Sequence, residues 1–92
     1  MEKNPLILLI DDEPQILRAL KTILTANRFR VITSTTGDEG LALAAAELPE
    51  VIILDMTLPD MDGVEVCRQI RQWSSVPIII LSVRDNEKDK VA

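Results

Sequence analysis

The sequence has 92 residues, of which 47% are hydrophobic and 27% are charged, and its formal net charge is −5. This length allows a single domain, and the acidic balance, with one Phe and one Trp, argues against direct nucleic-acid contact by this chain. Histidine is absent, which excludes histidine-based catalysis and histidine metal sites within this chain. Cysteine occurs once, as Cys67, which excludes an internal disulfide and leads us to expect a cytoplasmic location.

The first two predicted elements are a buried strand and an amphipathic helix. The aliphatic run Leu6–Ile10 is typical of a strand covered on both faces, and it is too short for a membrane span or a signal segment. From Pro14 onward the apolar residues recur with a helical period, at Ile16, Leu17, Leu20, Ile23 and Leu24. Pro14 suits the first turn of this helix, because the N–H that proline lacks would have no partner there.

The later elements repeat this alternation. Strands are predicted over Phe29–Thr33, Val51–Leu54 and Val76–Leu81. A helix is predicted over Gly37–Leu48, and the residues on its inner face would be Leu41, Ala44, Ala45 and Leu48. Another is predicted over Gly63–Gln72, with Asp62 as its cap. The charged segment Arg84–Ala92 would begin a further helix.

This order of elements predicts an α/β fold with a parallel sheet and helices on both faces. Because crossovers are right-handed, the favoured arrangement is a flavodoxin-like, doubly wound sheet with strand order 2-1-3-4, built by one domain over residues 1–92. In such sheets ligands bind beyond the carboxyl ends of the strands, where the strand order reverses. That point is expected between the first and third strands.

Three carboxylates are expected at this point. The first strand is followed by Asp11 and Asp12, the third by Asp55, and the fourth by Ser82. Clustered carboxylates repel one another, and a divalent cation relieves that repulsion. An all-oxygen set of ligands favours Mg²⁺ over zinc, and an Asp beside it can accept a phosphoryl group.

Each of these residues also has a simpler interpretation when it is considered alone. Asp12 could cap the helix that begins at Pro14, Asp55 could cap the loop after its strand, and Ser82 could be a turn residue. Their joint placement favours a shared site, because caps need no common crevice. Four other residues are assigned structural roles: packing for Cys67 and Trp73, and loop or cap roles for Asp60 and Asp62.

The motifs resemble those of two-component response-regulator receiver domains. They are LIDDEP at 9–14, VIILDMTLPDMDG at 51–63 and VPIIILS at 76–82, in the order and spacing of that family. The LPDMDG loop after a strand-terminal Asp is the most specific of them. Within the family the chain is similar to the OmpR-type branch, and CRQIRQWSS at 67–75 is similar to the KdpE-type regulators of potassium transport.

The resemblance implies a role for each matching residue. Asp55 would accept a phosphoryl group from a sensor histidine kinase, and Ser82 would give its hydroxyl to a phosphoryl oxygen. Asp11, Asp12, Asp55 and the backbone carbonyl of Thr57 would bind Mg²⁺. The chain would be a signalling switch that controls transcription through another domain, with self-phosphorylation and slow autodephosphorylation as its only catalysis.

The family pattern also includes a lysine and an aromatic residue on a fifth strand, and the sequence ends before either. Val76–Leu81 is then expected to be an apolar edge strand, beside a sheet face without its fifth helix. Such a chain is expected to be unstable as a monomer, to form a homodimer or a domain-swapped dimer, or to be part of a longer protein. Whether it can be phosphorylated without the lysine is open.

Two other functions remain open from the sequence. The chain could be an interaction module that keeps the acids but is not phosphorylated. It could instead be a phosphatase of the haloacid-dehalogenase type, although that family has an Asp where this chain has Thr57, and its nucleophile follows the first strand.

Overall fold

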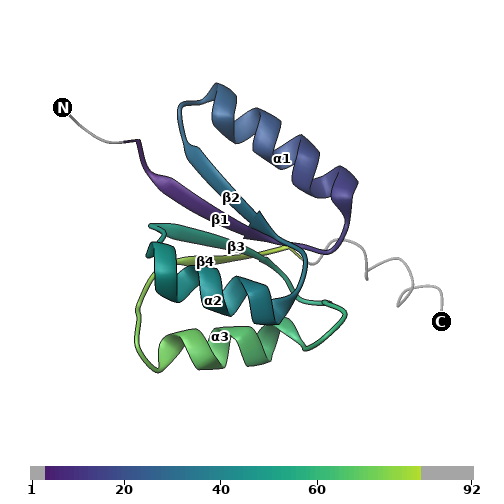
Figure 1. Ribbon diagram of the computed structural model, residues 1–92, viewed down its shortest axis with the longest axis vertical. Coiled ribbons are helices and arrows are strands. Elements are labelled where there is room, and N and C mark those ends of the chain that lie inside the picture. Colours follow the sequence, from purple (N-terminus) through teal and green to yellow (C-terminus); the bar gives the residue numbers. More distant parts are fainter. Residues whose placement is uncertain (1–3, 82–92) are drawn as a thin grey trace.

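The computed structural model describes residues 4–81, in which parallel strands alternate with helices (Figure 1). The strands are β1 (Leu6–Ile10), β2 (Arg30–Ser34), β3 (Val51–Asp55) and β4 (Ile78–Leu81). The helices are α1 (Pro14–Ala26), α2 (Gly37–Glu47) and α3 (Gly63–Arg71). Every predicted element that falls on described residues is confirmed, with boundaries within two residues of those expected. The predictions for Ser82 and Arg84–Ala92 lie outside the described residues.

The sheet has the strand order β2-β1-β3-β4 with every pair parallel, as predicted. Helix α1 lies on one face of the sheet, and α2 and α3 lie on the other (Figure 1). The chain after β1 crosses to β2 on one side, and the chain after β3 continues to β4 on the other side. The strand order therefore reverses between β1 and β3.

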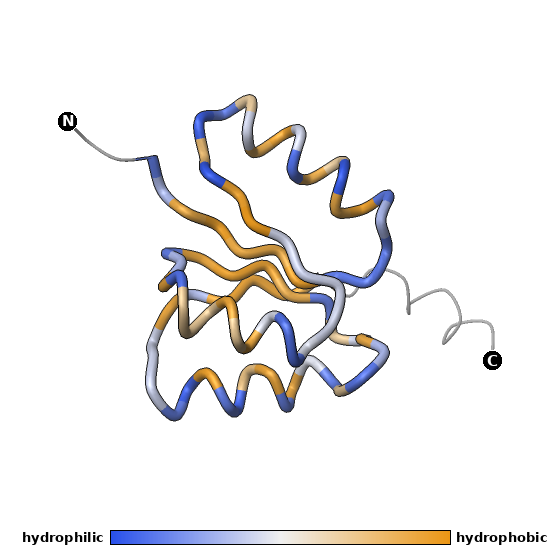
Figure 2. The backbone as a smooth tube through the Cα atoms, in the orientation of Figure 1, coloured by the Kyte–Doolittle hydropathy of each residue, from blue (hydrophilic) through white to orange (hydrophobic). Residues whose placement is uncertain are grey.

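The strand β1 is central because both of its faces are buried. All five of its residues are buried, and alternate residues point to opposite faces of the sheet. Leu8 and Ile10 join the core beneath α2 and α3, whereas Ile7 and Leu9 join the core beneath α1. In Figure 2 the strands form a hydrophobic layer between helices that alternate in hydropathy.

Three predicted packing positions are wrong. Leu48 lies outside α2 in a left-handed conformation (φ 50°), with 68% of its surface exposed, and Ala45 is also exposed. The helix ends at Glu47 because Pro49 disfavours helical geometry at the residue before it. Trp73, which was also predicted to pack, is 49% exposed after the end of α3 at Arg71.

The strand β4 lies at one edge of the sheet that the described residues form. Ile79 and Ile80 are exposed on it, as expected for an apolar edge strand. Among residues 4–81, no helix combines the length and the apolar character that crossing a membrane requires.

Candidate metal and phosphoryl site

The carboxyl ends of β1 and β3 bring acidic residues together. Ile10 pairs with Leu54 in the parallel register, so Asp11 and Asp55, which follow them, reach the same edge of the sheet. This edge is where the strand order reverses, the position at which doubly wound folds bind ligands. The fold therefore directs both acids into the expected crevice.

The cluster consists of Asp11, Asp12 and Asp55. Each residue offers a carboxylate oxygen, and these oxygens all lie within 4.8 Å of one another. Asp11 and Asp55 are each only 4% exposed, whereas Asp12 is exposed. The cluster therefore has two buried carboxylates and one that faces solvent.

Local hydrogen bonds orient the two buried carboxylates. Asp11 Oδ1 accepts the backbone N–H of Glu13 at 2.8 Å, and Asp55 Oδ1 accepts that of Thr57 at 3.2 Å. Each is a bond from an Asp to the backbone two residues later, the geometry of an Asx turn. The backbone N–H of Asp11 donates to the Ser34 carbonyl at 3.1 Å, which extends the β1–β2 pairing up to the cluster.

The loop after Asp55 is closed at its base by the backbone. Thr57 and Asp62 form an antiparallel bridge, and the Gly63 N–H donates to the Met56 carbonyl at 2.8 Å. A Cβ on Gly63 would lie 2.7 Å from the Met56 Cα and 3.1 Å from the Asp55 carbonyl oxygen. Only glycine fits this approach. From its sequence context Gly63 was predicted only to begin a helix, and its close contact with the backbone of Met56 was missed.

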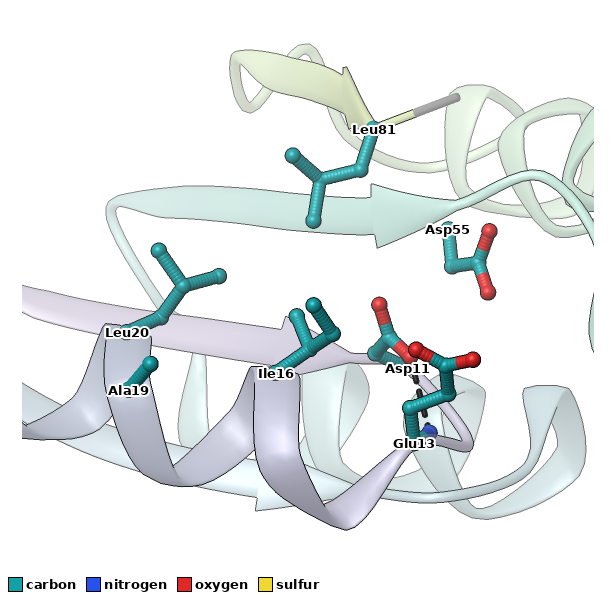
Figure 3. Close-up of a pocket in the computed structure, with 7 residues that line it drawn as sticks. All are labelled: Asp11, Glu13, Ile16, Ala19, Leu20, Asp55 and Leu81. Atoms are coloured by element: carbon teal, nitrogen blue, oxygen red, sulfur yellow. Dashed lines mark hydrogen bonds between the residues drawn. The ribbon is translucent and has the colours of Figure 1, made fainter. Parts of the chain in front are cut away.

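The two buried acids also line a cavity of about 210 Å³ between α1 and the sheet. Glu13 joins them at the polar end, and the opposite end is aliphatic (Figure 3). The aliphatic lining residues are Ile16, Ala19, Leu20 and Leu81. Glu13 was not among the residues predicted for the site, and its position next to Asp11 and Asp12 is the sequence feature that could have added it.

Four further acidic or hydroxyl residues were considered from the sequence: Thr57, Asp60, Asp62 and Ser82. Thr57 is exposed at the beginning of the β3–α3 loop, and Ser82 lies outside the described residues. Asp62 is the N-cap residue of α3, but its side chain makes no capping hydrogen bond. Asp60 binds the N-terminus of α2 instead of joining the acids.

The donor set fits a hard divalent cation. Two like charges buried side by side are costly, and a cation between them removes most of that cost. The cluster offers carboxylate oxygens only, which is the chemistry that Mg²⁺ prefers over softer metals. The exposed position of Asp12 leaves the cluster open to water, several molecules of which Mg²⁺ usually retains.

Comparison with known proteins agrees with this fold. A family model described as the response regulator receiver domain matches residues 7–92. The solved receiver domain of the Francisella response regulator 1452 superimposes with a TM-score of 0.84 at 31% identity, covering 96% of this chain and 74% of that one. The chain therefore belongs to the response regulator receiver domain family.

Within that family the similarity extends to transcriptional regulators. The chain is 51% identical over 86 residues to the transcriptional regulatory protein KdpE of Mycobacterium tuberculosis, and 48% identical to the KDP operon transcriptional regulatory protein KdpE of Escherichia coli. Both alignments cover 94% of this chain but 38% of the relative. The chain thus spans well under half the length of these curated relatives.

Proposed function

We propose that this receiver domain takes a phosphoryl group onto Asp55 from a phosphohistidine of a sensor kinase. The observation that supports this most strongly is the meeting of Asp11, Asp12 and Asp55 at the switch point of the sheet, with their oxygens within 4.8 Å of one another. Two-component phosphotransfer needs a carboxylate nucleophile beside a bound cation. The cluster contains a carboxylate that could attack phosphorus and further carboxylates that could bind the cation.

In the proposed transfer, a carboxylate oxygen of Asp55 attacks the phosphorus atom in line with the phosphohistidine nitrogen. The new O–P bond forms as the P–N bond breaks, and the electron pair of that bond stays on the imidazole, which takes up a proton. Asp55 becomes an acyl phosphate. The N–H bond from Thr57 holds one Asp55 oxygen, which fixes the plane of the nucleophile before the donor arrives.

The residues proposed to hold Mg²⁺ are Asp12, Asp55 and the backbone carbonyl of Thr57, with Asp11 holding a water of the cation. When bound, the cation neutralises charge on the phosphoryl oxygens during transfer. Asp11 is oriented by the Glu13 N–H, so its carboxylate is placed before any ligand binds. Ser82 is proposed to donate its hydroxyl to a phosphoryl oxygen of the product.

The wider role is inferred from the regulators that this chain resembles. Residues 1–92 would form the receiver domain of a cytoplasmic transcriptional regulator, with the output on a domain outside this sequence. Phosphorylation would shift a two-state equilibrium and change how the domain associates, by homodimerisation or domain swapping. Catalysis would be limited to its own phosphorylation and slow dephosphorylation.

Incubation with acetyl phosphate tests the proposal, because this small acyl phosphate replaces the kinase. The intact protein should gain one phosphoryl group in the presence of Mg²⁺ and none when the cation is chelated. Asp55→Asn should gain none, while Glu47→Gln, which changes an exposed acid at the end of α2, should still be labelled. Equal labelling of the wild type and Asp55→Asn would reject Asp55 as the acceptor.

A further inference from the structure

We propose that Asp60 is a positioning residue for the cation site, acting by tying the β3–α3 loop to the N-terminus of α2. Its Oδ1 accepts the backbone N–H of Gly37 at 2.7 Å, and its Oδ2 accepts that of Asp38 at 2.9 Å. These residues are 23 and 22 positions away in sequence. The inference rests on the proposed function, since it concerns how the proposed Thr57 ligand is held.

The helix end that Asp60 binds would otherwise have unpaired donors. The first four N–H groups of a helix have no partner within it. In α2 the Thr36 side chain accepts the N–H of Glu39, and the Thr36 carbonyl accepts the N–H of Gly40. Asp60 supplies acceptors for the first two residues of the helix, Gly37 and Asp38. The capping of α2 is therefore completed from the loop that follows Asp55.

Each carboxylate oxygen of Asp60 accepts one N–H of α2, so two hydrogen bonds fix the orientation of this side chain. Hydrogen bonds from N–H groups to a carboxylate are stronger than neutral ones, and a helix N-terminus also attracts negative charge. The two N–H groups hold the pKa of Asp60 below its usual value of 3.8, which agrees with a bond to the ionised form. At neutral pH the carboxylate is therefore in the form that binds α2.

The contact fixes the tip of a loop whose base is already closed. The Thr57–Asp62 bridge and the Gly63 bond to Met56 hold the two ends of the loop together. Residues 58–61 lie between these two ends, and Asp60 bonds this part of the loop to α2. Asp60 lies three positions after Thr57, and its bond to α2 gives the loop a further anchor beyond its base. Loss of the bond would leave the loop held at its base alone, so that the Thr57 carbonyl, at the start of the loop, is held less firmly in the position in which it is proposed to face the cation.

The test measures Mg²⁺ affinity by calorimetry and amide hydrogen exchange in the intact protein. Asp60→Ala is expected to lower Mg²⁺ affinity about tenfold, as the loss of an outer partner of a metal site commonly does. Asp60→Asn keeps one acceptor oxygen and should fall between Asp60→Ala and the wild type. Asp38→Ala is the matched control, because it removes an acid from the same end of α2 but leaves the backbone N–H that Asp60 binds.

Hydrogen exchange without Mg²⁺ provides the second measurement. In Asp60→Ala, the peptides that contain Gly37 and Asp38 and the loop 56–62 should exchange faster than in the wild type, and in Asp38→Ala they should not. Mg²⁺ affinity equal to that of the wild type in Asp60→Ala would overturn the positioning role, whether or not exchange rises. A wild-type protein that binds no Mg²⁺ would overturn the proposed function, and this role with it.

Discussion

Asp11 and Asp55 follow the ends of neighbouring parallel strands, and their carboxylate oxygens lie within 4.8 Å of each other while both side chains are almost wholly buried. Charged groups in such surroundings interact strongly, because protein screens them less than water does. A cluster of carboxylates at the point where strand order reverses therefore favours binding of a cation.

Magnesium should stabilise the folded protein. Binding only to the native state raises the free energy of unfolding by about 2.7 kcal/mol when free Mg²⁺ is roughly 100 times its Kd. Thermal unfolding across a Mg²⁺ series should show this as a rising Tm. Asp12→Asn should weaken the effect strongly, whereas Glu47→Gln, at the exposed end of α2, should keep it. The same rise in Tm for Asp12→Asn as for the wild type would contradict binding at the cluster.

Gly63→Ala should destabilise the domain by about 1–3 kcal/mol, the usual cost of forcing atoms into a packed site. The added Cβ would meet the backbone of Met56 at 2.7 Å, and backbone cannot move aside cheaply. Urea unfolding measures the change. Gly37→Ala is the control, because its Cβ would meet the flexible Met61 side chain, so its cost should be smaller. A larger loss of stability in Gly37→Ala than in Gly63→Ala would show that the base of the loop is not tightly packed.

Leu48→Gly should stabilise the domain by roughly 0.5–1 kcal/mol. Leu48 has a positive φ of 50° after α2, a conformation that costs most residues about 1–2 kcal/mol and costs glycine almost nothing. Little packing is lost, because the side chain is mostly exposed. Thermal unfolding is the measurement.

Ala45→Gly, at an exposed position inside the same helix, is the matched control for that change. It should destabilise the domain by about 1 kcal/mol, because glycine is unfavourable where φ is helical. If both glycine substitutions were destabilising, backbone strain at Leu48 would not be significant.

The contribution of Asp60 to stability should depend on pH. Its pKa is lowered in the folded state by the N–H groups of Gly37 and Asp38, so its stabilising effect is complete above 3.8, the usual value. The effect is lost as pH falls below 3.8 through the lowered folded pKa. The difference in unfolding free energy between the wild type and Asp60→Asn should therefore be constant at neutral pH and shrink in acid. A difference that did not change with pH would argue against the ionised contact.

Much of the fold could be predicted because its rules are local. Continuous apolar runs such as Leu6–Ile10 indicate parallel strands, and alternation with helical periods indicates a doubly wound sheet. Strand order then predicts that residues ending β1 and β3 share one edge. Predicting that the acids at these strand ends lie close together required no knowledge of side-chain packing.

The parts that were missed depend on contacts between distant segments. The bond from Asp60 to the N-terminus of α2 joins residues more than 20 positions apart, and no local pattern distinguishes that carboxylate from the neighbouring Asp62. Trp73 follows the end of α3, where no helical periodicity assigns a side chain to the inner or the outer face.

The most direct test of the account is to locate the phosphoryl group after reaction with acetyl phosphate and Mg²⁺. Borohydride reduces an acyl phosphate to an alcohol, so the labelled aspartate becomes homoserine and can be identified by peptide mass spectrometry. The account predicts homoserine at position 55 and unmodified aspartate at positions 11 and 12. Homoserine at position 11 or 12, or its absence from a protein that has bound Mg²⁺, would contradict the assignment of Asp55 as the phosphoryl acceptor.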